Sequence, residues 1–560
     1  MPSRPYPLIQ TVPVPKGTDA FEAKREEILT TFINKVPQEY YIAQHYVDNP
    51  PQDVTSIPRE CGVLSEEELE ITETYDVVGL AAAIAKRKYS ALAVAKAFCK
   101  RAIICDQISC CLTQWFPELA YKQAEALDRH LEETGMTVGP FHGVPISIKQ
   151  HIPIAGTFSD VGFVSTSTFD DKDCQMVSIL RGLGAVFYVK TSQPQAIMHL
   201  ESDNHLGRVL NPFNIDLSAG GSSGGESALI ALRGSILGVG TDIGGSIRGP
   251  AGFCGIYGYK PTAHILPMQG FIKGGFGAEL SITCSTGPMC LTLRDLDLFM
   301  NLVLESKPSL DDPRLCPILW TGLRTNLGAD AGRPLRIGVM FCDGVIEPQP
   351  PVKRAIQWAT RLLGVSPLVR LKPYKAYKVA DAISMIRQLY WPDGGRAIKS
   401  ALALTGEPMH LLTEHIMRDA VGKEKTASEL LQAHVERDAF RCEFAQDWNE
   451  QDVDVVLCPV SVGPAAAHDT SFFWHYTALW NCVDYPSIVF PTPIKAGKKG
   501  IEQYSFEQPL SNQDAHVRQM WKEINYEGAP IALQLVARRH HDNQLLGALK
   551  LVADILGIPV

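Results

Sequence analysis

Short apolar runs with the character of β-strands alternate with helix-length segments from Asp76 to the C-terminus, and this alternation restricts the fold more than any other feature. The strand candidates are residues 144–149, 185–190, 235–241, 336–341, 453–457, 487–490 and 531–536. Helical patterns lie among them at residues 80–87, 92–104, 117–135, 352–363 and 543–555. Strands that alternate with helices pair into a sheet, and the helices cover its two faces. The sequence therefore predicts an α/β protein.

The first 75 residues differ from the rest. Five prolines among the first 15 residues predict an extended arm. Helices are predicted at residues 21–36 and after Ser65, because Glu68 stands three residues beyond this serine as in a capping box. We therefore expect residues 1–75 to form an arm and a helical extension, packed on a body formed by residues 76–560.

The composition is that of a globular protein with no electrostatic signature for nucleic acid. Of the 560 residues, 45% are hydrophobic and 20% are charged, and the net charge is −9. The sequence contains no run of about 20 apolar residues, the length needed to span a bilayer, and the N-terminus lacks the apolar core of a secretory signal. The 14 cysteines include no C-x-x-C pair, which argues against a disulfide scaffold or a thiolate metal site. We expect a cytoplasmic protein without a nucleic-acid or membrane partner.

A lysine ends one of the strand candidates. The segment Gly143-Val-Pro-Ile-Ser-Ile-Lys149 places Ile146 and Ile148 close to this side chain. Partial burial disfavours the charged ammonium group, so such a lysine can be neutral near pH 7 and accept a proton. A solvated lysine at a strand end is the other interpretation, and this segment taken alone favours it.

Two turns rich in glycine and serine follow. The first is Ala219-Gly-Gly-Ser-Ser-Gly-Gly-Glu-Ser227, which contains Ser222 and Ser223 and runs into a helical pattern. The second, Gly240-Thr-Asp-Ile-Gly-Gly-Ser-Ile-Arg-Gly-Pro250, follows a strand candidate and contains Ser246. Glycines permit tight turns to which a substrate carbonyl can come close. A flexible linker is the alternative for the first turn, but hydrophobic elements adjoin it.

The second turn also suits the binding of an anion. Four successive backbone amides can converge on one point as an anion-holding nest. They belong to Ile243, Gly244, Gly245 and Ser246. Donors aimed at the negative charge that develops in acyl transfer form an oxyanion hole. Asp242 and Arg248 are close enough along the chain to pair and support this loop, although both could instead be solvated.

The sequence does not match the common nucleotide-binding or metal-binding motifs. Residues 184–191 lack the second glycine of a P-loop, no G-x-G-x-x-G follows a strand, and H-E-x-x-H is absent. Residues 220–224 fit the G-x-S-x-G elbow of α/β hydrolases, which must follow a core strand. Residues 211–218 precede them and are predicted to be a loop, so the elbow is disfavoured.

Taken together, the lysine segment and the two turns resemble the amidase signature family. The resemblance rests on Lys149 and on the motifs at residues 220–225 and 240–248, with 73 residues from Lys149 to Ser222 and 24 from Ser222 to Ser246. Further segments look like the C-terminal part of fungal acetamidase-type members, namely residues 454–459, 481–486 and 526–536. The resemblance implies that residues 76–560 form one catalytic domain, with a large mixed sheet between layers of helices.

The resemblance also implies a Ser–cis-Ser–Lys triad. Ser246 would be the nucleophile, and Ser222, on a cis peptide bond, would relay protons between Ser246 and a neutral Lys149. The backbone of residues 243–246 would hold the oxyanion. The loops would be supported by Ser223, Asp242 and Arg248. The reaction would hydrolyse the C–N bond of a carboxylic amide through an acyl-enzyme, and it would need no cofactor and no metal.

The substrate pocket is expected to be apolar. By the same resemblance, Ile197 and Met198 would lie near the acyl group of the substrate. An aromatic wall near the entrance is expected from a cluster of four residues, namely Phe472, Phe473, Trp474 and Tyr476. Packing of these side chains in the core is the alternative interpretation. Such a pocket would take a neutral, fairly apolar amide, aryl amide or carbamate as its small-molecule substrate.

Three other functions stay open. The chain could be a carbamate or ester hydrolase that uses the same triad. It could instead be an amidotransferase subunit that supplies ammonia to a tRNA-modifying partner, or an inactive scaffold or binding protein. The sequence does not determine the oligomeric state, and a homodimer is one of the states that it allows. His142 and His151 flank the lysine segment and are predicted to be structural residues.

Overall fold

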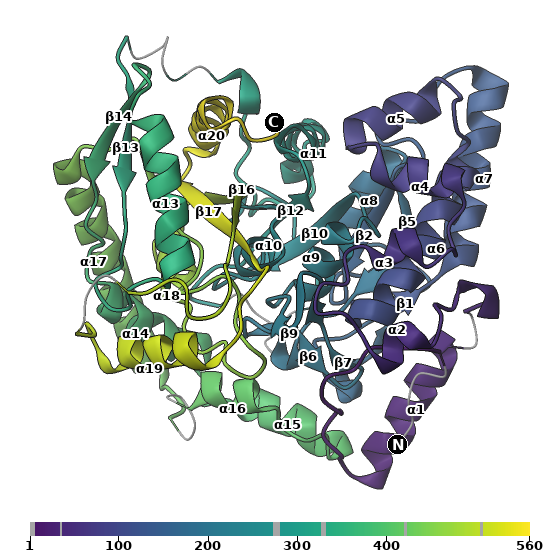
Figure 1. Ribbon diagram of the computed structural model, residues 1–560, viewed down its shortest axis with the longest axis horizontal. Coiled ribbons are helices and arrows are strands. Elements are labelled where there is room, and N and C mark those ends of the chain that lie inside the picture. The colour runs from purple at the N-terminus through teal and green to yellow at the C-terminus, as the bar shows by residue number, and fades with distance from the viewer. Residues whose placement is uncertain are drawn as a thin grey trace.

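A large mixed β-sheet runs through the protein, and helices cover both of its faces (Figure 1). The computed structural model describes residues 6–33, 36–272, 280–325, 327, 332–418, 423–504 and 508–560. Within these ranges the strands of the large sheet are β1 (Leu112–Trp115), β2 (Pro145–Lys149), β5 (Val186–Thr191), β10 (Leu237–Asp242), β11 (Tyr257–Lys260), β12 (Ser285–Cys290), β13 (Leu335–Val339), β14 (Val369–Pro373), β15 (Val455–Pro459), β16 (Ser487–Lys495) and β17 (Pro530–Ala537).

The order of these strands across the sheet is β1-β5-β2-β10-β12-β11-β16-β17-β15-β13-β14. Parallel pairs lie toward each end of the sheet, where β2 pairs with β5 and β10 and β13 pairs with β14 and β15. The other pairs are antiparallel. The predicted α/β class, with a large mixed sheet between layers of helices, is confirmed.

The helices of the described residues range from short turns to long rods. They are α1 (Asp19–Ile33), α2 (His45–Asp48), α3 (Ile57–Glu60), α4 (Glu66–Glu73), α5 (Val77–Ala85), α6 (Ala91–Ser109), α7 (Pro117–Thr134), α8 (Gln175–Gly182), α9 (Gly224–Ala231), α10 (Arg248–Cys254), α11 (Leu293–Glu305), α13 (Pro350–Leu363), α14 (Val379–Tyr390), α15 (Arg396–Thr405), α16 (Leu411–Met417), α17 (Ala427–Gln451), α18 (His475–Cys482), α19 (Asn512–Glu523) and α20 (Asp542–Leu556). Of those described, none combines the length and the apolar character that a bilayer-spanning helix requires.

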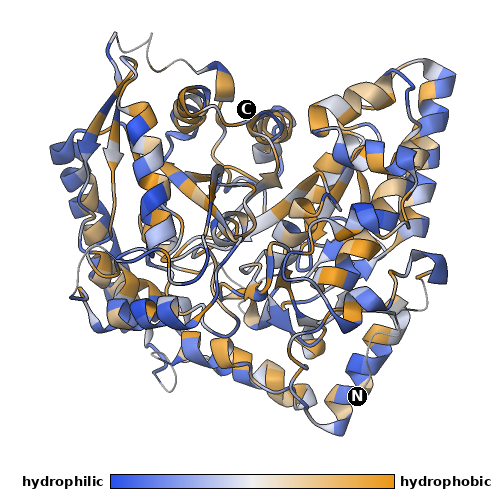
Figure 2. Cartoon of the chain, viewed as in Figure 1, coloured by the Kyte–Doolittle hydropathy of each residue, from blue (hydrophilic) through white to orange (hydrophobic). Residues whose placement is uncertain are grey.

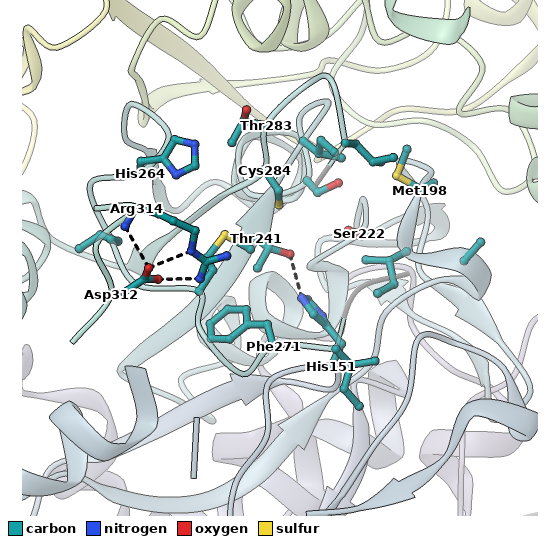
Figure 3. A pocket seen from close by; sticks show the side chains of 18 of the residues that line it. His151, Met198, Ser222, Thr241, His264, Phe271, Thr283, Cys284, Asp312 and Arg314 are labelled. Carbon is teal, nitrogen blue, oxygen red and sulfur yellow. Dashed lines mark hydrogen bonds and ion pairs between the residues drawn. The ribbon is translucent and has the colours of Figure 1, made fainter. Parts of the chain in front are cut away.

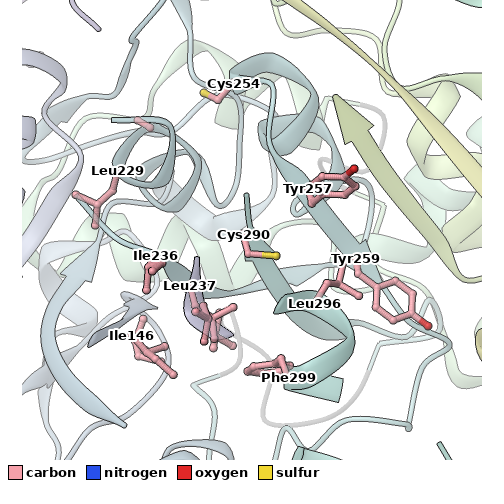
Figure 4. Close-up of a cluster of buried hydrophobic side chains, with 14 of the residues drawn as sticks. Ile146, Leu229, Ile236, Leu237, Cys254, Tyr257, Tyr259, Cys290, Leu296 and Phe299 are labelled. Atoms are coloured by element: carbon pink, nitrogen blue, oxygen red, sulfur yellow. The ribbon is translucent and has the colours of Figure 1, made fainter. Parts of the chain in front are cut away.

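Alternate residues of the central strands are buried on opposite faces of the sheet. On β17, Leu533 and Leu535 belong to the largest hydrophobic cluster, whereas Val536 belongs to a second cluster that contains Trp448 of α17. This follows from the two-residue period of a strand. Figure 4 shows part of the largest cluster, in which Leu237 of β10 and Phe299 of α11 are packed. Figure 2 shows the matching pattern of hydropathy, with hydrophilic faces on the outer helices.

The N-terminal segment packs against the sheet-bearing body. Tyr6 and Ile9 of the arm and Ile71 of α4 belong to the largest hydrophobic cluster. The predicted capping box is present: the Glu68 amide donates to Oγ of Ser65 and the Ser65 amide donates to the Glu68 carboxylate. The first predicted helix is found as α1, although residues 34–35 at its predicted end lie outside the described residues. The division of the chain at residue 75 stays a prediction.

One local prediction is wrong. Residues 211–218, predicted to be a loop, belong largely to a small hairpin of β8 (Leu210–Asn211) and β9 (Asn214–Ser218). The side chain of Asn211 adds hydrogen bonds to the backbone pairing, because its Nδ2 donates to the Ser218 carbonyl and its Oδ1 accepts from the Phe213 amide in the turn. The hairpin is separate from the large sheet, so the turn at residues 220–224 still does not follow a core strand.

Candidate active site

Two neighbouring parallel strands bring the chemically important segments together. β2 ends at Lys149, and β10, which pairs with β2, ends at Asp242. The carboxyl ends of parallel strands meet at the same edge of a sheet, so the loop that follows β10 starts beside Lys149. The turn that contains Ser222 leads into α9, and α9 packs against both strands. Three segments that are far apart in the sequence therefore meet at one place.

The amine of Lys149 is fully buried. Its Nζ lies 2.6 Å from Oγ of Ser222 and 3.2 Å from Oγ1 of Thr241. Burial lowers the pKa of Lys149 to about 7, although the nearby acidic groups Asp242 and Glu226 act in the opposite direction. A substantial fraction of this amine is therefore neutral at neutral pH and can accept a proton.

A buried carboxyl group, that of Glu226, lies close enough to the lysine to interact with its charge. Glu226 of α9 accepts a hydrogen bond from Oγ1 of Thr191 at 2.9 Å and another from the hydroxyl of Ser147. Burial raises the pKa of Glu226 to about 8, and the hydrogen bonds and the charge of Lys149 oppose this shift. Glu226 is therefore largely protonated near neutral pH and adds little negative charge beside the amine, which allows Lys149 to lose its proton.

The two serines belong to turns that are joined through the backbone. The Ser223 amide donates to the carbonyl oxygen of Ser246 at 3.0 Å. The peptide bond between Gly221 and Ser222 is cis, as the family resemblance implies. Ser222 and Ser246 both line one cavity, and Figure 3 shows Ser222 at its wall. The structure therefore brings Lys149, Ser222 and Ser246 into one site.

A buried ion pair supports the loop that carries Ser246. Arg248 donates two hydrogen bonds to Asp242, from Nε at 3.0 Å and from Nη2 at 3.0 Å, and both side chains are fully buried. Burial alone would raise the pKa of Asp242, but the charge of Arg248 and its hydrogen bonds hold this pKa well below its usual range. Asn481 bonds to both partners and completes the cluster.

The same carboxylate shapes the backbone of the loop. Asp242 accepts hydrogen bonds from the Gly245 amide at 2.9 Å and from the Ile247 amide at 3.2 Å. Gly245 has a φ of +130°, and a Cβ at this position would lie 2.2 Å from Oγ1 of Thr477, so only glycine fits. The Gly245 amide is thus directed at Asp242, while Ile243 and Ser246 line the cavity.

The cavity beside the serines has a volume of about 150 Å³ and a mainly apolar wall. Its apolar lining comes from Ala196, Ile197, Met198, Ile243, Leu266, Met268, Phe271, Ile272, Leu280, Leu315 and Trp391. Figure 3 shows a charged pair at one side, where Arg314 donates to Asp312 from Nε at 2.8 Å and from Nη2 at 2.7 Å. These two opposite charges offset each other, so the cavity favours a neutral ligand.

The residues predicted to form the pocket separate into two groups. Ile197 and Met198 line the cavity that contains the serines. Phe472, Phe473 and Trp474 instead line a second cavity of about 300 Å³. The remaining residue, Tyr476, is buried in the core, where its hydroxyl donates to the carbonyl oxygen of Ile346 at 2.7 Å. The aromatic wall expected from this cluster is therefore not part of the wall around Ser222 and Ser246.

Several residues of the cavity were not selected from the sequence. Thr241 lies inside the second glycine motif, so its position next to Lys149 could have been noticed from that motif. His151, treated as structural, has its ring in the cavity wall. Phe271 and Trp391 come from segments more than a hundred residues from the lysine segment, and no local pattern connects them with it.

Comparison with known proteins agrees with the site. The family model named Amidase matches residues 93–546. A Schizosaccharomyces pombe protein named as an amidase is 38% identical over 509 residues, which cover 90% of this chain and 93% of that protein. An acetamidase of Aspergillus oryzae is 34% identical over 514 residues, with coverage of 90% and 93%. A solved fatty acid amide hydrolase has a TM-score of 0.88 at 30% identity, and 96% of each chain is covered.

The fold and the relatives together define an amide-hydrolysing enzyme that acts on carbon–nitrogen bonds. The chain belongs to the amidase family. The predicted family membership and the predicted enzyme class are thus confirmed, and the assignment of individual catalytic residues stays a proposal.

Replacing the carboxylate of the buried ion pair tests its role in the loop. Asp242→Asn should lower the free energy of unfolding by about 3–5 kcal/mol, because the buried charge of Arg248 would lose its partner. Asp554→Asn is the matched control: its exposed pair with Lys550 should contribute at most about 0.5 kcal/mol. Urea unfolding of both variants measures the difference. Equal effects of the two substitutions would contradict the buried-pair argument.

Proposed function

We propose that this amidase uses Ser246 as its nucleophile and transfers protons through Ser222 to Lys149. The observation that carries the proposal is the buried amine of Lys149, 2.6 Å from the hydroxyl of Ser222 in the site that also contains Ser246. An amine with a pKa of about 7 is suited to act as a base near neutral pH. The triad therefore needs no histidine to accept the proton of the nucleophile.

In the first step, Ser246 attacks the amide carbonyl. The proton of its hydroxyl passes to Oγ of Ser222, and the proton of Ser222 passes to Nζ of Lys149, which becomes an ammonium group. The carbonyl oxygen becomes an oxyanion. Backbone amides of residues 243–246 would hold it, chiefly those of Ile243, Gly244 and Ser246, because the Gly245 amide donates to Asp242.

The tetrahedral intermediate then collapses. The carbon–nitrogen bond breaks, Ser222 gives its proton to the departing nitrogen, and Lys149 returns its proton to Ser222. The amine or ammonia leaves, and the acyl group stays on Ser246 as an ester. Water attacks this ester with the same residues as base and acid, and the carboxylic acid is released. The free enzyme is restored with Lys149 neutral.

The substrate is proposed to be a small, neutral aliphatic or aryl amide. An apolar cavity of about 150 Å³ is large enough to hold a molecule of the size of benzene. The similar proteins include acetamidases and a fatty acid amide hydrolase, and the substrates in these names carry acyl groups that range from very small to long. The volume of this cavity favours the small end of that range.

Removal of the nucleophile tests the proposal directly. Ser246→Ala should lower kcat/KM for an amide by about 10⁴-fold or more, because no covalent intermediate can form. Labelling by a fluorophosphonate probe should also be lost. Ser227→Ala is the matched control, because this buried serine lies in α9 after the turn that carries Ser222, does not line the cavity, and donates its hydroxyl to the carbonyl oxygen of Ala219. An active and labelled Ser246→Ala variant would show that another residue is the nucleophile.

The pH dependence of activity tests the role of Lys149. Its pKa is lowered to about 7, and only the neutral amine can accept a proton. We therefore expect kcat/KM to rise about tenfold per pH unit below pH 7 and to level off above it. The profile should be measured with a neutral amide whose own charge does not change. A kcat/KM that is constant, or falls, as the pH rises through 7 would contradict a lysine base.

A substrate panel tests the chemical class. Acetamide, an anilide, ethyl carbamate, a p-nitrophenyl ester and a charged amide can be compared by kcat/KM. We expect the neutral amides to be preferred over the charged amide by about tenfold or more, because the apolar wall would desolvate a charge without pairing it. A strong preference for the charged amide would contradict the proposed pocket. Faster turnover of the carbamate would instead favour a carbamate hydrolase with the same triad.

A further inference from the structure

We propose that His151 is a positioning residue for amide hydrolysis, which acts through Thr241 to keep the lone pair of Lys149 directed at Ser222. The inference rests on the triad proposed above and adds a residue outside it. His151 follows β2 by two residues, and its buried ring forms part of the cavity wall. Figure 3 shows the ring pointing toward Thr241.

The side chain of Gln193 determines which ring nitrogen of His151 carries the proton. Nε2 of Gln193 donates to the carbonyl oxygen of Asp160 at 2.8 Å, a position that the amide oxygen could not occupy without repulsion. Oε1 of Gln193 therefore faces Nδ1 of His151 at 2.8 Å. An amide oxygen can only accept, so Nδ1 carries the proton and Nε2 carries a lone pair.

Thr241 receives its orientation from this ring. Its Oγ1 lies 3.4 Å from Nε2 of His151, which is the longest of the contacts that connect Gln193 with Lys149. Because Nε2 can only accept in this tautomer, the hydroxyl of Thr241 donates to it. The same oxygen lies 3.2 Å from Nζ of Lys149. With its own proton already directed at His151, Thr241 can only accept from the amine.

The direction of these hydrogen bonds matters for the base. A neutral amine has two N–H groups and one lone pair. One N–H of Lys149 is taken by Thr241, and the lone pair is left for the hydroxyl of Ser222, 2.6 Å away. Without an acceptor at His151, the Thr241 hydroxyl could turn and donate to Nζ. It would then occupy the lone pair that Ser222 needs in order to transfer its proton.

The ring keeps this tautomer because it stays neutral. Burial is the main cause that lowers the pKa of His151 to about 3. The charge of Lys149 on β2, when this lysine is protonated, and the charge of Lys190 on β5 lower it further, and the hydrogen bond with Gln193 opposes them. Nε2 therefore retains its lone pair throughout the pH range in which Lys149 is neutral.

Four variants test the proposal. His151→Leu removes the acceptor, whereas His151→Gln places an amide oxygen where Nε2 stands. We expect kcat for an amide to fall about tenfold in His151→Leu, the effect of one lost hydrogen bond, with little change in KM. The rate of fluorophosphonate labelling should fall in parallel, and His151→Gln should restore both rates. In a Thr241→Val background, His151→Leu should have no further effect, because His151 acts only through the Thr241 hydroxyl.

Three outcomes would overturn the proposal: a His151→Leu variant with wild-type kcat, a His151→Gln variant as slow as His151→Leu, or effects of His151→Leu and Thr241→Val that multiply in the double variant. A packing role for His151 predicts the last two. His142→Leu is the control for loss of a buried histidine outside the site, and thermal unfolding shows whether each variant is folded. If Ser246→Ala is active, the triad itself fails. If Ser246→Ala is inactive and His151→Leu behaves as wild type, only the role of His151 fails.

Discussion

Burial of the Lys149 amine, away from water and beside two hydroxyl groups, is the constraint on which the rest of the site depends. An ammonium group placed there without a carboxylate bonded to it is destabilised, so its pKa falls to about 7. Glu226, a buried carboxyl group close to the amine, is itself shifted toward the protonated state. The amine is thereby available as a base at a pH where an exposed lysine would be fully charged.

Several parts of the fold together produce this environment. The strands β2 and β10 hold the amine and the start of the nucleophile loop at one edge of the sheet. The buried pair of Asp242 and Arg248 gives that loop its shape through side-chain and backbone hydrogen bonds. The cavity wall is mainly apolar, and a less polar surrounding strengthens electrostatic interactions within the site. His151 and Thr241 extend the site by giving the hydrogen bonds around the amine a direction.

Much of the fold could be predicted from the sequence because the central strands are strongly apolar. Residues 144–149 and 531–536 are examples, and both are found in the large sheet as β2 and β17. Four strands of the large sheet were missed, and two of them carry breaks in this pattern: β11 contains Gly258, and β12 contains Gly287 followed by Pro288. Such segments become strands only because neighbours on both sides supply hydrogen-bond partners. That information is tertiary and is not present in a local pattern.

The candidate site, like the fold, could be predicted from the sequence only in part. Lys149, Ser222 and Ser246 stand in compact motifs, so their proximity could be expected from the family resemblance. The wall of the cavity comes from scattered segments, which explains why Trp391 was missed and why Trp474 was placed in the wrong cavity. His151 was treated as structural because its neighbours in space, Gln193 and Thr241, are 42 and 90 residues away along the chain. Only the three-dimensional arrangement shows the direction of its hydrogen bonds.

The protonation state of Lys149 can be observed directly by neutron diffraction from crystals kept at a pH about two units above its pKa. The account predicts two deuterons on Nζ, with one of them directed at Thr241. It also predicts that the hydroxyl deuteron of Ser222 points at Nζ and that the deuteron of Thr241 points at His151. Three deuterons on Nζ at that pH, with Ser222 accepting one of them, would contradict the central claim that this lysine is the neutral base.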